Sequence, residues 1–108
     1  MQPQPLTGVD PQPVRAAALL PEGYDTVETT VRAVLRDVLG LSADRVAGFT
    51  ATTPLFGALP ELDSMAVAGV LTEIEDRLGI LIEDDEVDGE MLESFGALTR
   101  FAADKALG

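Results

Sequence analysis

The stretch "PELDSMAVAGVLTEIEDRLGI", residues 60–80, carries the clearest helical pattern in the chain. After Ser64, apolar residues recur at spacings of three and four, which places them on one face of an amphipathic helix. They are Val67, Val70, Leu71, Ile74 and Leu78. We expect this helix to begin at Asp63 or Ser64, since both residue types are good N-caps, and to end at Gly79.

A second helix is predicted upstream of this one. Asp25 and Glu28 have the spacing of a capping box, and Gly40 supplies a stop. The apolar stripe between them is Val27, Val31, Val34, Leu35 and Val38. Residues 41–62 then form a long connection, in which Ser42 and Asp44 suggest a short helical turn. The apolar residues expected to anchor this connection in the core are Val46, Phe49, Leu55, Phe56 and Leu62.

The pattern after Gly79 is weaker. We interpret residues 80–82 as a buried linker and expect a brief helical turn near residues 86–92. Ser94 can cap a last helix that frays after Asp104. The residues expected to face inward from this helix are Phe95, Leu98, Phe101 and Ala102. The predicted fold is all-α: a four-helix bundle of three longer helices and one short helix, with a long first loop.

The first 22 residues differ in composition from the rest of the chain. They contain five of the seven prolines and little hydrophobic periodicity, which is typical of an extended, disordered tail. We therefore divide the chain into a Pro-rich flexible tail, residues 1–22, and one domain, residues 23–108.

Composition excludes several classes of function. The chain has no Cys and no His, and therefore lacks thiolates, disulfides and the commonest general base. Its formal charge of −12 would repel nucleic acid and anionic membranes, and favours a protein partner with a basic face. The sequence shows neither a membrane-spanning run nor a signal peptide. We expect a cytoplasmic monomer that does not insert into membranes.

The acidic residues are concentrated around Ser64. Residues 60–93 hold twelve of the nineteen, with Arg77 as the only base in that segment. A solvated, solubilising surface is the ordinary explanation of such a run. Its position beside a candidate site favours a recognition surface instead.

Ser64 has three possible roles: helix cap, nucleophile or attachment point. A hydrolytic serine needs a base, and neither a His nor a G-x-S-x-G elbow is present. A helix N-terminus, by contrast, favours a phosphate through its free N–H groups and dipole. A separate enzyme could therefore attach a phosphodiester to this serine.

Residues 84–95 partly match a calcium-binding loop. Asp84, Glu86, Asp88 and Gly89 occupy positions one, three, five and six of the motif, but Phe95 stands where a bidentate Glu is needed. We therefore expect no specific metal site and interpret the segment as a solvated acidic loop.

In these features the sequence resembles the acyl carrier protein family, whose attachment motif is D-S-L or D-S-M. "LDSMAVAGVLTEIEDRLGI", residues 62–80, is similar to that motif and the helix that follows it. The resemblance covers residues 25–107. It implies a non-catalytic carrier whose Ser64, beside Asp63, bears a covalent 4′-phosphopantetheine arm derived from coenzyme A. The arm's thiol would hold an acyl or aminoacyl group as a thioester, in lipid or secondary-metabolite biosynthesis.

The resemblance also implies partners. These are a phosphopantetheinyl transferase, an acyl- or aminoacyl-loading ligase, and a downstream acyltransferase or synthase, all docking through basic surfaces. Met65 matches the apolar contact position, and Glu75 and Asp76 match acidic positions of the recognition helix. Glu73 belongs to the same acidic block.

Two departures point to a specialised carrier. Ala66 and Gly69 stand where fatty-acid carriers are often acidic, and Gly69 costs about 1 kcal/mol of helix propensity relative to Ala. Similarity extends to D-alanyl carriers and, in "LPELDSMAVAGVL" (residues 59–71), to carriers found beside bacterial exosortase systems. The alternative function is an unmodified acidic helical interaction module or a divalent-cation-binding protein.

Overall fold

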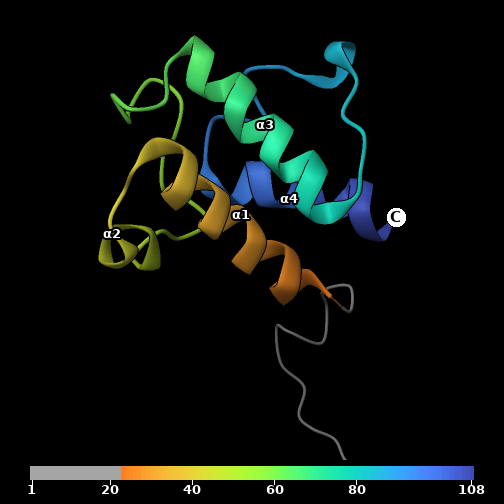
Figure 1. The fold of residues 1–108 in the computed structure, drawn as a ribbon, viewed down its shortest axis with the longest axis horizontal. Helices are drawn as coiled ribbons and strands as arrows, with labels where there is room; N and C mark the ends of the chain where they lie inside the picture. The colour runs from red at the N-terminus through yellow and green to blue at the C-terminus, as the bar shows by residue number, and fades with distance from the viewer. Residues whose placement is uncertain (1–22) are drawn as a thin grey trace, which may run out of the picture.

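A computed structural model describes residues 23–108 of the chain, and its regular elements are helical (Figure 1). They are α1 (Tyr24–Leu39), α2 (Ala43–Ala47), α3 (Ser64–Leu78), the 3₁₀ helix η3 (Asp84–Glu86) and α4 (Phe95–Leu107). The predicted all-α fold, with three longer helices and one short α-helix, is confirmed. The predicted Pro-rich tail, residues 1–22, lies outside the described residues.

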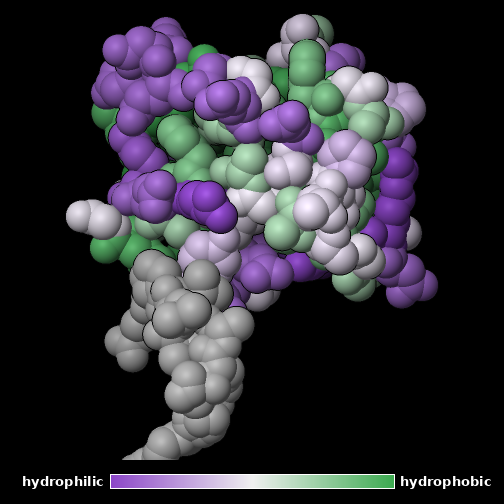
Figure 2. All heavy atoms as spheres, turned by 180° about the vertical axis from the view of Figure 1, so that it is seen from behind, coloured by the Kyte–Doolittle hydropathy of each residue, from purple (hydrophilic) through white to green (hydrophobic). Residues whose placement is uncertain are grey.

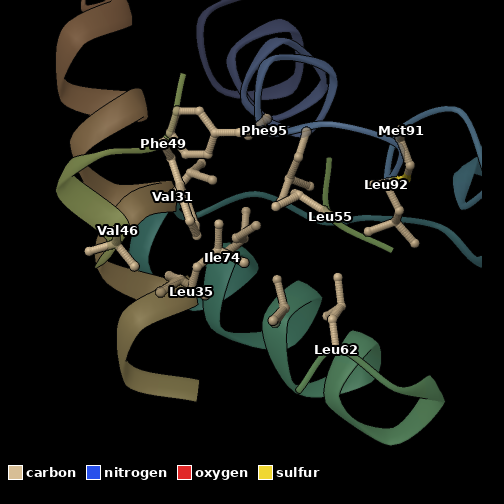
Figure 3. Packing of buried hydrophobic residues seen from close by; sticks show 14 of the residues in the cluster. Val31, Leu35, Val46, Phe49, Leu55, Leu62, Ile74, Met91, Leu92 and Phe95 are labelled. Atoms are coloured by element: carbon tan, nitrogen blue, oxygen red, sulfur yellow. The ribbon is translucent and has the colours of Figure 1, made fainter. Parts of the chain in front are cut away.

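Helix α1 is the centre of the bundle, because it packs against α2, α3 and α4. Its apolar stripe contributes side chains with no exposed surface, among them Val31 and Leu35. Ile74 of α3 and Leu98 of α4 are equally buried. Figure 3 shows Val31, Leu35 and Ile74 converging between the helices. The spacing of three and four in the sequence therefore predicts these core positions correctly. Other predicted positions are only partly buried: Val38, Val67, Leu71, Leu78 and Phe101.

The start of α1 differs from the prediction. The helix begins at Tyr24 rather than at Asp25, and its N-cap is Gly23, which makes no side-chain cap hydrogen bond. Gly23 has φ of 94°, a left-handed conformation that glycine adopts without steric cost. Asp25 therefore lies within the first turn, and the proposed Asp25–Glu28 capping box is wrong.

The first loop is held by its own apolar side chains, as expected. Ser42 caps α2 by accepting a hydrogen bond from the N–H of Arg45 at 3.1 Å. The prediction fails for Phe56, whose side chain is 49 % exposed. The predicted anchors that are buried are Val46, Phe49, Leu55 and Leu62.

Arg32 fastens this loop to α1. Its guanidinium donates hydrogen bonds to the carbonyl oxygens of Val46 and Phe49, the latter at 3.1 Å. It also pairs with Glu28 at 2.7 Å and lies 4.6 Å from the centre of the Phe95 ring. A residue on the polar side of the sequence pattern thus joins three parts of the fold.

The segment between α3 and α4 is only partly as predicted. In the expected buried linker Ile82 is buried, but Leu81 is 66 % exposed. The helical turn expected near residues 86–92 lies earlier, at η3, because Glu83 and Glu86 form a capping box that closes there. Residues 89–93 form turns instead, one of them closed by the bond from the Met91 N–H to Asp88 Oδ1 at 3.0 Å.

Helix α4 starts as predicted and ends later. Ser94 caps it by accepting a hydrogen bond from the N–H of Ala97 at 3.1 Å. Fraying after Asp104 was expected, but the helix continues to Leu107. Lys105 explains the difference, because its Nζ lies 2.9 Å from both carboxylate oxygens of Glu86 and ties the last turn to η3. None of the helices in residues 23–108 has the length and apolar character that crossing a membrane requires.

Candidate functional site

Ser64 is the first residue of α3, and its side chain is exposed. The preceding residue, Asp63, is the N-cap: its Oδ1 accepts a hydrogen bond from the N–H of Ala66 at 2.8 Å. Among the described residues no hydrogen bond holds the Ser64 hydroxyl. The sequence left the choice of cap open between these two residues, and the structure shows that Asp63 is the cap.

The backbone around Ser64 favours a negatively charged group. The N–H groups of the first helical turn have no partner within the helix, and Asp63 takes up only that of Ala66. Together with the helix dipole, the remaining N–H groups stabilise an anion close to the Ser64 hydroxyl. The Asp63 carboxylate opposes this effect, since it adds negative charge beside the same position.

A cleft of about 330 Å³ begins at Ser64 and runs along α3. One wall comes from residues of α3 spaced three and four apart, and the other from the segment around η3. The residues that line it are Ser64, Val67, Ala68, Leu71, Thr72, Glu75, Ile82, Asp84 and Val87. From Ser64 to Glu75 the helix rises roughly 16 Å, at 1.5 Å per residue. The apolar part of this wall, from Val67 to Leu71, covers roughly 6 Å of that length, at 1.5 Å per residue.

The opposite wall of the cleft could not be found from the sequence. Ile82, Asp84 and Val87 were assigned to a linker and an acidic loop, with no role at the site. Their only signal is that apolar residues interrupt an acidic run. The Ile82 N–H donates a hydrogen bond to Glu75 Oε2 at 2.7 Å, which links this segment to α3.

The predicted docking residues lie in different surroundings along α3. Met65 is 85 % exposed, an unusual position for a large apolar side chain. Glu73 pairs with Arg77 at 3.0 Å, and the Glu75 carboxylate holds the Ile82 N–H. Asp76 is exposed. Among the described residues, Asp76 is thus the one of these three acids that forms neither an ion pair nor a hydrogen bond to the following loop.

The calcium-loop residues do not form a metal centre. Phe95, at the position of the required bidentate ligand, is 2 % exposed and belongs to the core. Within residues 23–108 no three acidic side chains come close enough together to hold a metal ion. Glu86 is instead paired with Lys105, whose hydrogen bond lowers the pKa of the Glu86 carboxyl.

Residues 29–102 match the family described as "phosphopantetheine attachment site". A solved structure, that of a holo acyl carrier protein from Nitrosomonas europaea, is also similar to the chain, with 40 % sequence identity and a TM-score of 0.65. The similarity covers 72 % of this chain and 92 % of that protein. The chain belongs to the acyl carrier protein family. A search of curated proteins found no match.

This membership determines the cofactor and the general kind of function. The acyl carrier protein uses covalently bound 4′-phosphopantetheine, as the sequence predicted. Carriers of this family are generally not catalysts, and they interact with modifying and biosynthetic enzymes. The residues present fit the cofactor, because the matched region contains an exposed serine at a helix N-terminus with a cleft beside it.

Proposed function

We propose that Ser64 is the attachment residue and that the chain is a discrete carrier of acyl or aminoacyl groups. The observation that supports this is the free, exposed Ser64 hydroxyl at the mouth of the cleft, with Asp63 capping the helix in its place. In the attachment step Ser64 Oγ forms a bond to the coenzyme A phosphorus that bears the pantetheine arm, while the P–O bond of the pyrophosphate breaks and adenosine 3′,5′-bisphosphate leaves. The base that accepts the hydroxyl proton belongs to the transferase, so the absence of His from this chain is no obstacle.

The reactive thiol is supplied by the arm, which explains how a chain without Cys can carry a thioester. An arm attached at Ser64 and folded back along the cleft would lie against the apolar wall formed by Val67, Ala68 and Leu71.

Partners would dock around the mouth of the cleft. A phosphopantetheinyl transferase, a loading ligase and a downstream acyltransferase or synthase would each bring a basic surface to α3. Met65 supplies an exposed apolar contact, and Asp76, Glu73 and Glu75 supply negative charge. We propose that the carrier works as a monomer in the cytoplasm.

Intact mass spectrometry tests the attachment. The protein is incubated with coenzyme A, magnesium and a broad-specificity phosphopantetheinyl transferase. We expect the mass of one phosphopantetheinyl group to be added to the wild type and to be absent from Ser64→Ala. Ser42→Ala is the matched control, because it removes a serine hydroxyl elsewhere and should still be modified. A mass gain retained by Ser64→Ala, or none with several transferases, would refute the proposal.

A further inference from the structure

Phe56 is a half-exposed aromatic side chain on a backbone that is held firmly in place. The Phe56 N–H donates to the carbonyl oxygen of Leu92 at 3.0 Å, and the Leu55 N–H donates to the carbonyl oxygen of Glu93 at 3.0 Å. Pro54 pairs with Ser94 in the same antiparallel arrangement. Leu55 is completely buried, whereas the next residue, Phe56, begins a turn and is 49 % exposed. The backbone hydrogen bonds on either side of this step hold Phe56 in place, so its exposure does not come from a loose loop.

A shallow hollow of about 620 Å³ lies beside the Phe56 ring. Its other lining residues are Asp88, Gly89, Glu90 and Glu93. None of these three carboxylates forms an ion pair within residues 23–108, whereas five other acidic residues of that part of the chain do. The lining of this hollow thus combines one apolar aromatic face with three carboxylates that form no ion pair within residues 23–108. Arg100 lines the adjoining hollow, which shares Asp88 and Glu90.

The surrounding surface strengthens this negative field. Figure 2 shows hydrophilic side chains gathered at the upper left of the rear view, the side on which η3 lies. The exposed residues of that segment include Glu83, Asp84 and Asp85. Local negative charge of this kind accelerates association with a basic partner and selects against an acidic one.

We propose that this hollow is a second docking surface, which binds an arginine side chain presented by a basic partner protein. The planar guanidinium stacks on an aromatic ring while its N–H groups donate to carboxylates. A purely apolar partner would bury three carboxylates without compensation, at a large desolvation cost. A metal ion is disfavoured by the aromatic wall and by the spacing of the acids. The hollow and the Ser64 cleft share no lining residue, although Val87 of the cleft directly precedes Asp88 of the hollow.

Binding of model peptides tests the proposal. The ¹⁵N-labelled Ser64→Ala protein is titrated with a short Arg/Ala peptide and with a Lys/Ala peptide of the same length and charge. Using Ser64→Ala makes the outcome independent of whether Ser64 carries the arm. We expect the Arg peptide to shift the amide signals of residues 55–57 and 88–93 saturably. It should bind about two- to fivefold more tightly than the Lys peptide, as a cation–π contact at an exposed site would give.

Variants then separate the aromatic contact from general attraction between opposite charges. Phe56→Leu should abolish the preference for Arg over Lys, whereas Leu81→Ala, an exposed apolar residue outside the hollow, should leave it unchanged. Glu93→Gln should weaken both peptides more than Asp85→Asn, which removes the same charge outside the hollow. Equal binding of the two peptides to the Ser64→Ala protein that retains Phe56 would overturn the proposal. So would shifts confined to α3, or an unchanged Arg preference in Phe56→Leu.

Discussion

Arg77, in the last turn of α3, lies 3.0 Å from Asp37 near the end of α1, measured between Nη2 and Oδ2. The same guanidinium pairs with Glu73, and Asp37 also accepts from Arg36 at 2.9 Å. Hydrogen bonds from Arg36 and Arg77 lower the pKa of the Asp37 carboxyl. Those from Asp37 and Glu73 raise the pKa of the Arg77 guanidinium. These surface charges connect the two helices that form one side of the bundle.

The ion pair predicts a pH-dependent stability difference between the wild type and Asp37→Asn. Because the folded pKa of Asp37 lies below its unfolded value of about 3.9, its contribution is fully present above that value and is lost as the pH falls through the folded pKa. Urea unfolding should show a small advantage for the wild type at pH 7 that disappears near pH 2. High salt should also reduce the advantage. An equal advantage at pH 2 and pH 7 would contradict the assignment.

Because Asp63 and not Ser64 caps α3, substitutions at these two neighbouring residues should have unequal effects on stability. Asp63→Ala removes the acceptor for the Ala66 N–H and should lower the free energy of unfolding by about 1 kcal/mol. Asp63→Asn keeps an acceptor and should cost much less. Ser64→Ala should be close to neutral, since Ser64 is not the cap. Chemical denaturation measures all three, and a loss in Ser64→Ala as large as that in Asp63→Ala would rule out this division of roles.

The helices were predicted well because the residues that start and stop a helix lie close to its ends in the sequence. The end of α3 at Gly79, the cap at Ser94 and the short helix beside Ser42 follow from residues within one turn of each boundary. The start of α1 failed for a related reason: Asp25 and Glu28 have the correct spacing, but the N-cap is Gly23, two residues before Asp25. A sequence motif alone does not show which of two competing starts the backbone adopts.

Only the part of the site that lies on a single helix, α3, could be predicted from the sequence. Ser64 and the apolar positions after it were found because α3 orders them. The opposite wall at Ile82 and Val87, and the exposure of Phe56, depend on contacts between segments distant in sequence. The pairing of residues 54–56 with residues 92–94 leaves no periodic signal in either segment. Phe56 was therefore assigned to the core on hydrophobicity alone.

Gly69 illustrates a sequence anomaly that packing explains. A Cβ added at this position would lie 3.3 Å from Cγ1 of Val38, so glycine allows α3 to approach α1 closely. We expect Gly69→Ala to be nearly neutral, because a helix-propensity gain of about 1 kcal/mol is offset by crowding. In a Val38→Ala background, the same substitution should be stabilising. Thermal and urea unfolding of the four proteins in this cycle measure the coupling, and simple additivity of the two changes would disprove the contact.

We expect substitution of Arg32 to lower stability more than substitution of an ordinary surface arginine. Its guanidinium is bonded to the carbonyl oxygens of Val46 and Phe49, and Arg32→Met leaves both without this charged donor. We expect a loss of roughly 1.5–3 kcal/mol in the free energy of unfolding, the usual range for hydrogen bonds to a charged group. Arg36→Met, which removes only an exposed pairing with Asp37, should cost much less.

The same variant should loosen the first loop before it unfolds the bundle. Because Arg32 joins this loop to α1, its removal should speed amide hydrogen exchange in residues 46–50 more than in α3. Arg32→Lys should restore part of the protection, since an ammonium can still reach one carbonyl but cannot reproduce the fork or the stacking on Phe95. Equal exchange rates in Arg32→Met and Arg36→Met would show that the loop is held by its apolar anchors alone.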